Sequence, residues 1–148
     1  MNDLHELSLT EVCQHMKSGA LTAEAVTGHM LERIGMLEPR YKAYAMVRAD
    51  AAMERARQLD LLRRDGQPLG ALHGVPVAAK DLLFMAGEPT ASGTRVMADY
   101  RPSTTATVVE RLERAGAVII GRTQLTEGAF SEHHPDIDPP RNPWHADH

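Results

Sequence analysis

Lys80 is the residue of this sequence whose type and position most clearly allow acid–base chemistry. It closes a run of apolar and small residues, 72–80, which predicts a buried strand. A lysine there either leaves the core at the end of the strand or serves as a buried general base. Arginine could not be that base because it does not deprotonate in proteins, and of the 16 Lys and Arg residues only Lys17, Lys42 and Lys80 are lysines.

The polar residues near Lys80 each have a simpler structural interpretation. Asp81 follows directly, but adjacent side chains of a strand point to opposite faces, so the two need not form a pair. Ser92 lies in a stretch rich in Gly, Ser and Thr, 87–94, without a His–Asp pair at a recognisable spacing, which favours a turn over a nucleophile. Glu127 is most simply a carboxylate at the start of a helix.

The end of the sequence carries a cluster of side chains that could bind a metal. Its members are imidazoles and carboxylates: His133, His134, Asp136, Asp138, His145, Asp147 and His148. Such a composition can bind zinc or nickel. The sequence has neither a His-Glu-x-x-His helix nor a cysteine pair, however, so we expect adventitious binding, no specific metal site and no cofactor.

Composition and charge predict a soluble globular domain. Of the 148 residues, 43% are hydrophobic and 24% charged, and the net charge of −4 disfavours a nucleic acid as direct partner. No apolar run approaches the roughly 18 residues of a membrane helix. The N-terminus does not resemble a secretory signal, and Cys13 is the only cysteine, so we expect a cytoplasmic protein without an internal disulfide.

The first part of the sequence predicts a helical region. Two helices are expected within 8–38: Ser8 and Glu11 form a capping box at the start of the first, and Gly19 ends it. Thr22 is expected to cap the second helix and Pro39 to stop it.

Short strands then alternate with helices, which predicts α/β architecture. Expected strands cover 43–47, 75–80 and 117–121. Asp50 should cap a helix that ends at Arg64, and a further helix is expected over 106–115 with Val108, Val109 and Leu112 facing inward. Residues 131–148, rich in Pro, His and Asp, predict an extended loop.

Several segments, in this order, resemble the amidase signature family. They are Leu72–Asp81, Thr90–Gly93, Thr105–Gln124, Glu127–Phe130 and Arg141–Trp144. Two residues depart from the pattern: Arg122 stands where many relatives have lysine, and Gln124 where many have asparagine. The sequence also stops before the Gly/Ser-rich segment that follows in the family.

The resemblance implies both a fold and a reaction. The fold would be an incomplete amidase-signature α/β fold: N-terminal helices over 1–68, then the start of a mixed sheet flanked by helices over 69–148. The reaction would be hydrolysis of a small-molecule amide through a Ser–cis-Ser–Lys relay, in which Lys80 is the proton acceptor. We take Asp81, Ser92, Gln124 and Glu127 as supporting positions.

The relay's two serines belong to the segment that the sequence lacks. We therefore expect the isolated chain to be inactive, to leave Lys80 more exposed to water than in a complete enzyme, and to self-associate through an open sheet face. Two alternatives remain open. One is the amidase (A) subunit of a tRNA-dependent amidotransferase, and the other is a non-catalytic metal-binding or interaction module.

Overall fold

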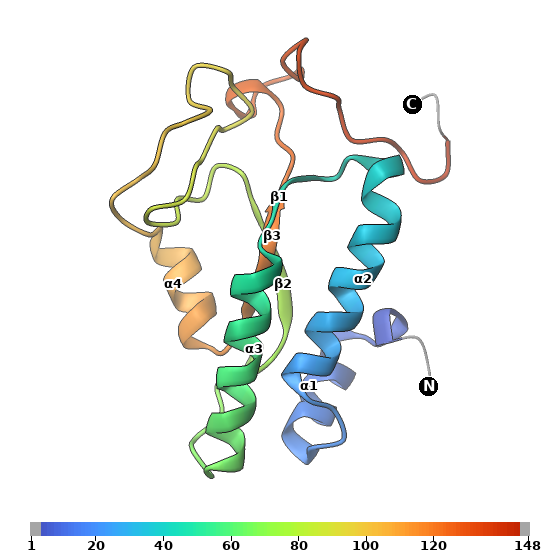
Figure 1. The fold of residues 1–148 in the computed structure, drawn as a ribbon, viewed down its shortest axis with the longest axis vertical. Helices are drawn as coiled ribbons and strands as arrows, with labels where there is room; N and C mark the ends of the chain where they lie inside the picture. The colour runs from blue at the N-terminus through green and yellow to red at the C-terminus, as the bar shows by residue number, and fades with distance from the viewer. Residues whose placement is uncertain (1–3, 146–148) are drawn as a thin grey trace. The chain divides into compact units, whose positions relative to one another are not determined.

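The computed structural model of the chain describes residues 4–145 and contains helices and one small sheet (Figure 1). The elements, in order, are the 3₁₀ helix η1 (Leu4–Glu6), α1 (Leu9–Ser18), α2 (Ala23–Tyr41), β1 (Tyr44–Val47), α3 (Ala49–Arg64), β2 (Pro76–Lys80), α4 (Thr107–Arg114), β3 (Val118–Thr123) and the 3₁₀ helix η2 (Glu127–Ala129).

The three strands form one mixed sheet with the order β1-β3-β2. Strand β1 is antiparallel to β3, with Tyr44 opposite Thr123 and Val47 opposite Gly121. The N–H of Val118 donates to the carbonyl of Val75 (2.8 Å), and the N–H of Asp81 donates to that of Thr123 (3.2 Å). Residue numbers rise together along β2 and β3, so these two strands are parallel. The predicted α/β class and its three strand segments are confirmed.

The sequence signals at the first two helices are confirmed in atomic detail. The Ser8 hydroxyl accepts from the N–H of Glu11 (3.3 Å), whose carboxylate accepts from the N–H of Ser8 (2.7 Å). Gly19 ends α1 with a left-handed φ of 81°, which favours a residue without a Cβ. Thr22 caps α2 by accepting from the N–H of Ala25 (3.1 Å).

Four details of the element prediction were wrong. Pro39 lies inside the last turn of α2, where a proline removes only one of the final hydrogen bonds, and the helix ends at Tyr41. The cap position of α3 is Arg48, so Asp50 lies in its first turn. Strand β3 continues to Thr123 because it pairs with β1 up to that residue. Val108, predicted to face inward, is 47% exposed, whereas Val109 is buried as predicted.

The chain divides into two compact units, and the first combines Met1–Gly35, Arg48–Val77 and Arg111–Ile120. Its core is made of apolar side chains from α1, α2, α3, β3 and the residue before β2: Val12, Met16, Ala23, Val26, Ala52, Ala56, Leu59, Val75, Val118 and Ile120. The buried Asp60 carboxylate fastens α3 to the start of α2, because it accepts from the N–H groups of Ala23 (2.8 Å) and Glu24 (2.9 Å).

His73 gives the first unit a predicted dependence of stability on pH. The side chain is buried, and its Nε2 atom has no hydrogen-bond partner among residues 4–145. Burial lowers the pKa of His73; Asp60 opposes that shift, while Arg63 and Arg55 reinforce it. As the pH falls below about 6.5, the unfolded chain is therefore protonated first, and the stability held above that pH is lost.

This pH dependence can be measured by urea unfolding at pH ~7.5 and pH ~5.5. The free energy of unfolding should fall more between these values in the wild type than in His73→Gln, which cannot titrate. Equal slopes in the two proteins would contradict a neutral buried imidazole.

The second unit combines Met36–Val47, Ala78–Glu110 and Gly121–His148. Most of it is loop, drawn in olive and yellow between β2 and α4 and in orange and red after β3 (Figure 1). Backbone hydrogen bonds close the first loop on itself: the N–H of Gly87 donates to Pro102 (2.9 Å) and that of Thr90 to Tyr100 (2.8 Å). The N–H of Ala106 donates to Phe84 (2.8 Å), which fixes the approach to α4.

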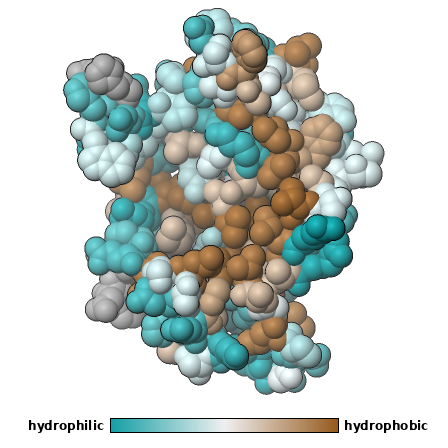
Figure 2. Space-filling view, turned by 180° about the vertical axis from the view of Figure 1, so that it is seen from behind, coloured by the Kyte–Doolittle hydropathy of each residue, from teal (hydrophilic) through white to brown (hydrophobic). Residues whose placement is uncertain are grey.

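Apolar side chains remain exposed on the surface of this chain. Figure 2 shows hydrophobic residues gathered in the middle of one face. In the second unit the most exposed large apolar residues are Met36, Val96, Phe130 and Trp144, which are 72–92% exposed. Within residues 4–145, no helix is both long and apolar enough to cross a membrane.

Candidate functional site

Lys80 stands at the last position of β2, and its side chain is exposed. The ammonium group Nζ donates a hydrogen bond to the backbone carbonyl of Gln124. Gln124 follows directly after β3, and its own N–H donates to the carbonyl of Ala43 (2.8 Å), just before β1. The structure thus brings together two of the residues singled out from the sequence, through the main chain of Gln124 and not through its amide side chain.

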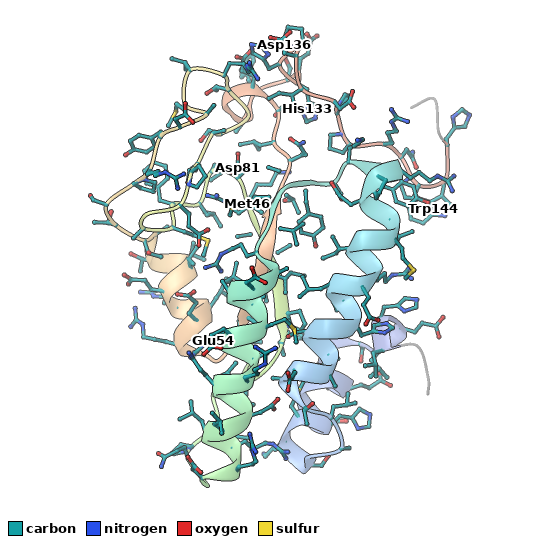
Figure 3. The ribbon with its side chains drawn as sticks, viewed as in Figure 1. Met46, Glu54, Asp81, His133, Asp136 and Trp144 are labelled. Atoms are coloured by element: carbon teal, nitrogen blue, oxygen red, sulfur yellow. The ribbon has the colours of Figure 1, made fainter. Side chains whose placement is uncertain are left out.

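Asp81 is the buried neighbour of the exposed Lys80. Its side chain is 5% exposed, and its carboxylate lies 3.6 Å from Nε of Arg122 on β3. In Figure 3, Asp81 and Met46 lie close to one another beside the same end of the sheet. As expected for consecutive positions at the end of a strand, Lys80 and Asp81 face in different directions.

The electrostatic environment of Asp81 combines opposing effects. Burial raises the pKa of this carboxyl above its usual range, while the Arg122 guanidinium and the N–H groups of Gly93, Ala91 and Ser92 act to lower it. Three consecutive backbone N–H groups thus favour the carboxylate form, as they would favour any anion. Asp81 is suited to hold the segment 91–93 in place.

Ser92 lies in a turn with a φ of 51°, an uncommon conformation for a residue other than glycine. Its N–H donates to the Asp81 carbonyl (3.1 Å), and its carbonyl accepts from the N–H of Gly128 (2.9 Å). Gly93 follows with a φ of 69°, and a Cβ there would lie 2.5 Å from the carbonyl oxygen of Leu125. The turn therefore needs glycine at 93 and joins the end of β2 to the segment after β3.

Glu127 begins the short helix η2, where its side chain is exposed. Its N–H donates to the carbonyl of Glu132 (2.7 Å). Glu127 is thus linked to Ser92 through the hydrogen bond of its neighbour Gly128.

The His- and Asp-rich loop does not gather its side chains around one point in the part of the chain that the structure describes. Residues 4–145 contain no group of three or more His, Cys, Asp or Glu side chains that could hold a metal ion. His134 Nδ1 instead accepts from the N–H of Asp136 (3.2 Å), next to His133 in the loop labelled in Figure 3. Asp147 and His148 lie outside the described residues.

Sequence reasoning missed the role of Arg122, which it treated only as a departure from a family pattern. This residue is 1% exposed, and its guanidinium donates through Nη1 to the Thr90 hydroxyl (2.7 Å) and through Nη2 to the Met46 sulfur (3.5 Å). Nη2 also lies 4.0 Å from the Glu88 carboxylate. A signal was present, because Arg122 interrupts the apolar run of a central strand, where a charge needs a partner.

Three comparisons with known proteins place these residues in a wider context. A family model described as Amidase matches residues 25–148. The amidase candidate AmiD of Mycobacterium tuberculosis is 45% identical over 141 residues, which cover 95% of this chain and 30% of that protein. The amidase (A) subunit of the glutamyl-tRNA(Gln) amidotransferase from Salinispora tropica is 39% identical over 146 residues, which cover 97% and 30%.

A solved structure of similar fold is a bacterial aryl acylamidase of the amidase signature family. It superposes with a TM-score of 0.89 at 25% sequence identity, over 95% of this chain and 30% of that one. This chain spans about 30% of the length of the curated relatives that it matches.

Proposed function

This chain belongs to the amidase signature family, and on that premise we propose that it supplies the catalytic lysine of an enzyme that hydrolyses the C–N bond of a carboxylic amide. The observation that carries the proposal is the position of Lys80. It ends β2, its amine reaches solvent, and that amine is held by the carbonyl of Gln124 beside the turn at Ser92.

The proposed chemistry assigns Lys80 the role of proton acceptor in a Ser–cis-Ser–Lys relay. A neutral lysine would accept a proton from a bridging serine, which accepts one from the nucleophilic serine. The nucleophile attacks the amide carbonyl, the amine leaves, and water releases the acid from the acyl-enzyme. Ser92 is not assigned either serine role, because its backbone closes the turn beside Asp81. Both serines would come from outside these 148 residues.

The test combines this chain with the part of a relative that it does not span. A chimera in which residues 1–148 replace the matching segment of AmiD should hydrolyse small amides, and the same chimera with Lys80→Ala should not. Residues 1–148 alone should not release product above the rate in buffer. Turnover by the isolated chain would contradict the proposal that the serines lie elsewhere.

A second candidate is the amidase (A) subunit of a tRNA-dependent amidotransferase, which would release ammonia from glutamine for a partner. The similarity to the Salinispora protein supports it. Hydrolysis of glutamine by the chimera only in the presence of the other amidotransferase subunits would favour this candidate. Hydrolysis of simple amides without a partner would favour the free amidase. In both cases we propose a small-molecule amide substrate and a cytoplasmic location.

The exposed apolar side chains also support self-association of the isolated chain. Phe130 and Trp144 are 86% and 90% exposed, and β1 and β2 are the outer strands of the described sheet. Sedimentation velocity should show a mass that rises with concentration, and the double variant Phe130→Ser and Trp144→Ser should lower it. A single monomeric species that unfolds cooperatively would contradict this proposal.

A further inference from the structure

We propose that Arg122 is a positioning residue for Lys80: its buried guanidinium holds Asp81 and Thr90 together and thereby fixes the direction in which the Lys80 amine leaves β2. The inference rests on the proposed function of Lys80 and concerns how the amine is held. It starts from Arg122, the largest fully buried side chain in the described part of the chain.

The Arg122 guanidinium uses all three of its nitrogen atoms to reach three other segments of the second unit. Nη1 donates to the Thr90 hydroxyl (2.7 Å), and Nε lies 3.6 Å from the Asp81 carboxylate. Nη2 faces the Met46 sulfur (3.5 Å) on β1 and the Glu88 carboxylate (4.0 Å). A rigid, planar fork can serve several partners at fixed angles. Arg122 therefore links β1, β3, the residue after β2 and the segment 88–90.

Asp81 is the point at which this linkage reaches Lys80. Its carboxylate faces Arg122 and the N–H groups of residues 91–93, and its own N–H donates to the carbonyl of Thr123 (3.2 Å). Main chain and side chain of residue 81 are thus both held by partners, which restricts its orientation. Because Lys80 precedes it in the strand and faces the other way, the orientation of Asp81 sets that of the lysine.

The acceptor of the Lys80 amine depends on the same arginine. Gln124, whose carbonyl accepts from Nζ, lies two residues beyond Arg122 in the chain. A displacement of Arg122 would move the acceptor as well as the donor. Arg122 is therefore expected to affect both the donor and the acceptor of the Lys80 hydrogen bond. It does so from a distance, since it is not itself at the proposed reacting group.

The test measures the chemical reactivity of Lys80 in the 148-residue chain. The rate at which an acylating reagent modifies each lysine is followed by mass spectrometry across pH, with Lys17 and Lys42 as internal controls. Arg122→Met should raise the rate at Lys80 alone by about tenfold, the effect of losing one hydrogen bond to a charged group. Compared with Arg122→Met, Arg122→Lys should restore only part of the wild-type protection of Lys80, because it returns a cation beside Asp81 but not the planar fork that also reaches Thr90 and Met46.

If Arg122→Met unfolds the chain, all three lysines will react faster and the result will not be specific to Lys80. A milder variant is therefore needed. Thr90→Val removes one acceptor of the guanidinium without burying a new charge, and it should raise the Lys80 rate by about threefold, a part of the same effect. An unchanged Lys80 rate in folded Arg122→Met or Thr90→Val would overturn the proposal. An equal rise at all three lysines in Thr90→Val would also overturn it.

These outcomes are separate from those that test the catalytic role. If Lys80→Ala leaves the chimera active while Arg122→Met changes Lys80 reactivity, the positioning inference stands and the proposed function fails. If Lys80→Ala abolishes turnover while Lys80 reactivity is the same in all variants, the proposed function stands and Arg122 has no positioning role.

Discussion

Replacing Lys80 with alanine in the AmiD chimera should lower turnover by about 10²–10⁴-fold, the usual contribution of a general acid–base group. The physical reason is that alanine has no side-chain group that can accept the proton at the end of β2. The measurement is the initial rate of amide hydrolysis at saturating substrate, which separates a loss of turnover from a loss of binding.

Lys80→Arg makes this prediction specific for proton transfer. Arginine keeps the positive charge and can still donate to the Gln124 carbonyl, but it cannot give up its proton in a protein. It should therefore be as inactive as alanine. Lys17→Arg and Lys42→Arg are matched controls and should keep wild-type turnover. An active Lys80→Arg chimera would show that charge, and not proton acceptance, is the contribution of residue 80.

Arg122→Met should destabilise the 148-residue chain by about 3–5 kcal/mol, the usual result of removing one partner of a buried ion pair. The Asp81 carboxylate would remain 5% exposed without its nearest cation, retaining only the backbone N–H groups of residues 91–93. The measurement is the free energy of unfolding from urea titrations.

The double variant Asp81→Asn with Arg122→Met provides the control for this effect. It should recover part of the stability, because an amide oxygen can still accept from the backbone N–H groups without the cost of a buried charge. A double variant less stable than Arg122→Met would contradict the ion-pair explanation.

The pH dependence of the stability of Arg122→Met is a second test of the ion-pair explanation, and its direction can be predicted. Burial already raises the pKa of Asp81, and without Arg122 the folded state would bind the proton still more tightly than the unfolded state. Stability relative to wild type should therefore decline as the pH rises above about 3.8, and be lowest where the carboxyl is fully ionised. A loss of stability independent of pH would indicate a packing defect alone.

Local chemistry made most of the secondary structure predictable. The capping box at Ser8, the glycine at 19 and the cap at Thr22 act within a few residues, so sequence spacing suffices to place them. The errors occurred where a distant segment decides the boundary. Strand β3 extends to Thr123 because β1 is available as a partner. On α4 the apolar spacing predicted both Val108 and Val109 to face inward, but only Val109 is buried.

The sequence by itself determined the α/β class, the three strand segments and the family, and it identified Lys80 by its residue type and its place at the end of a strand. The predicted burial of that strand was wrong, because only Ala79 of β2 is buried. Only the tertiary structure decided what surrounds that lysine: the Gln124 carbonyl at its amine, the exposed side for Lys80 and the buried side for Asp81, and the arginine 41 positions further along the chain that neutralises the carboxylate. The physical reason is that hydrogen bonds and ion pairs depend on distance in space. The periodicity of the sequence does not specify which two buried charged side chains will form an ion pair.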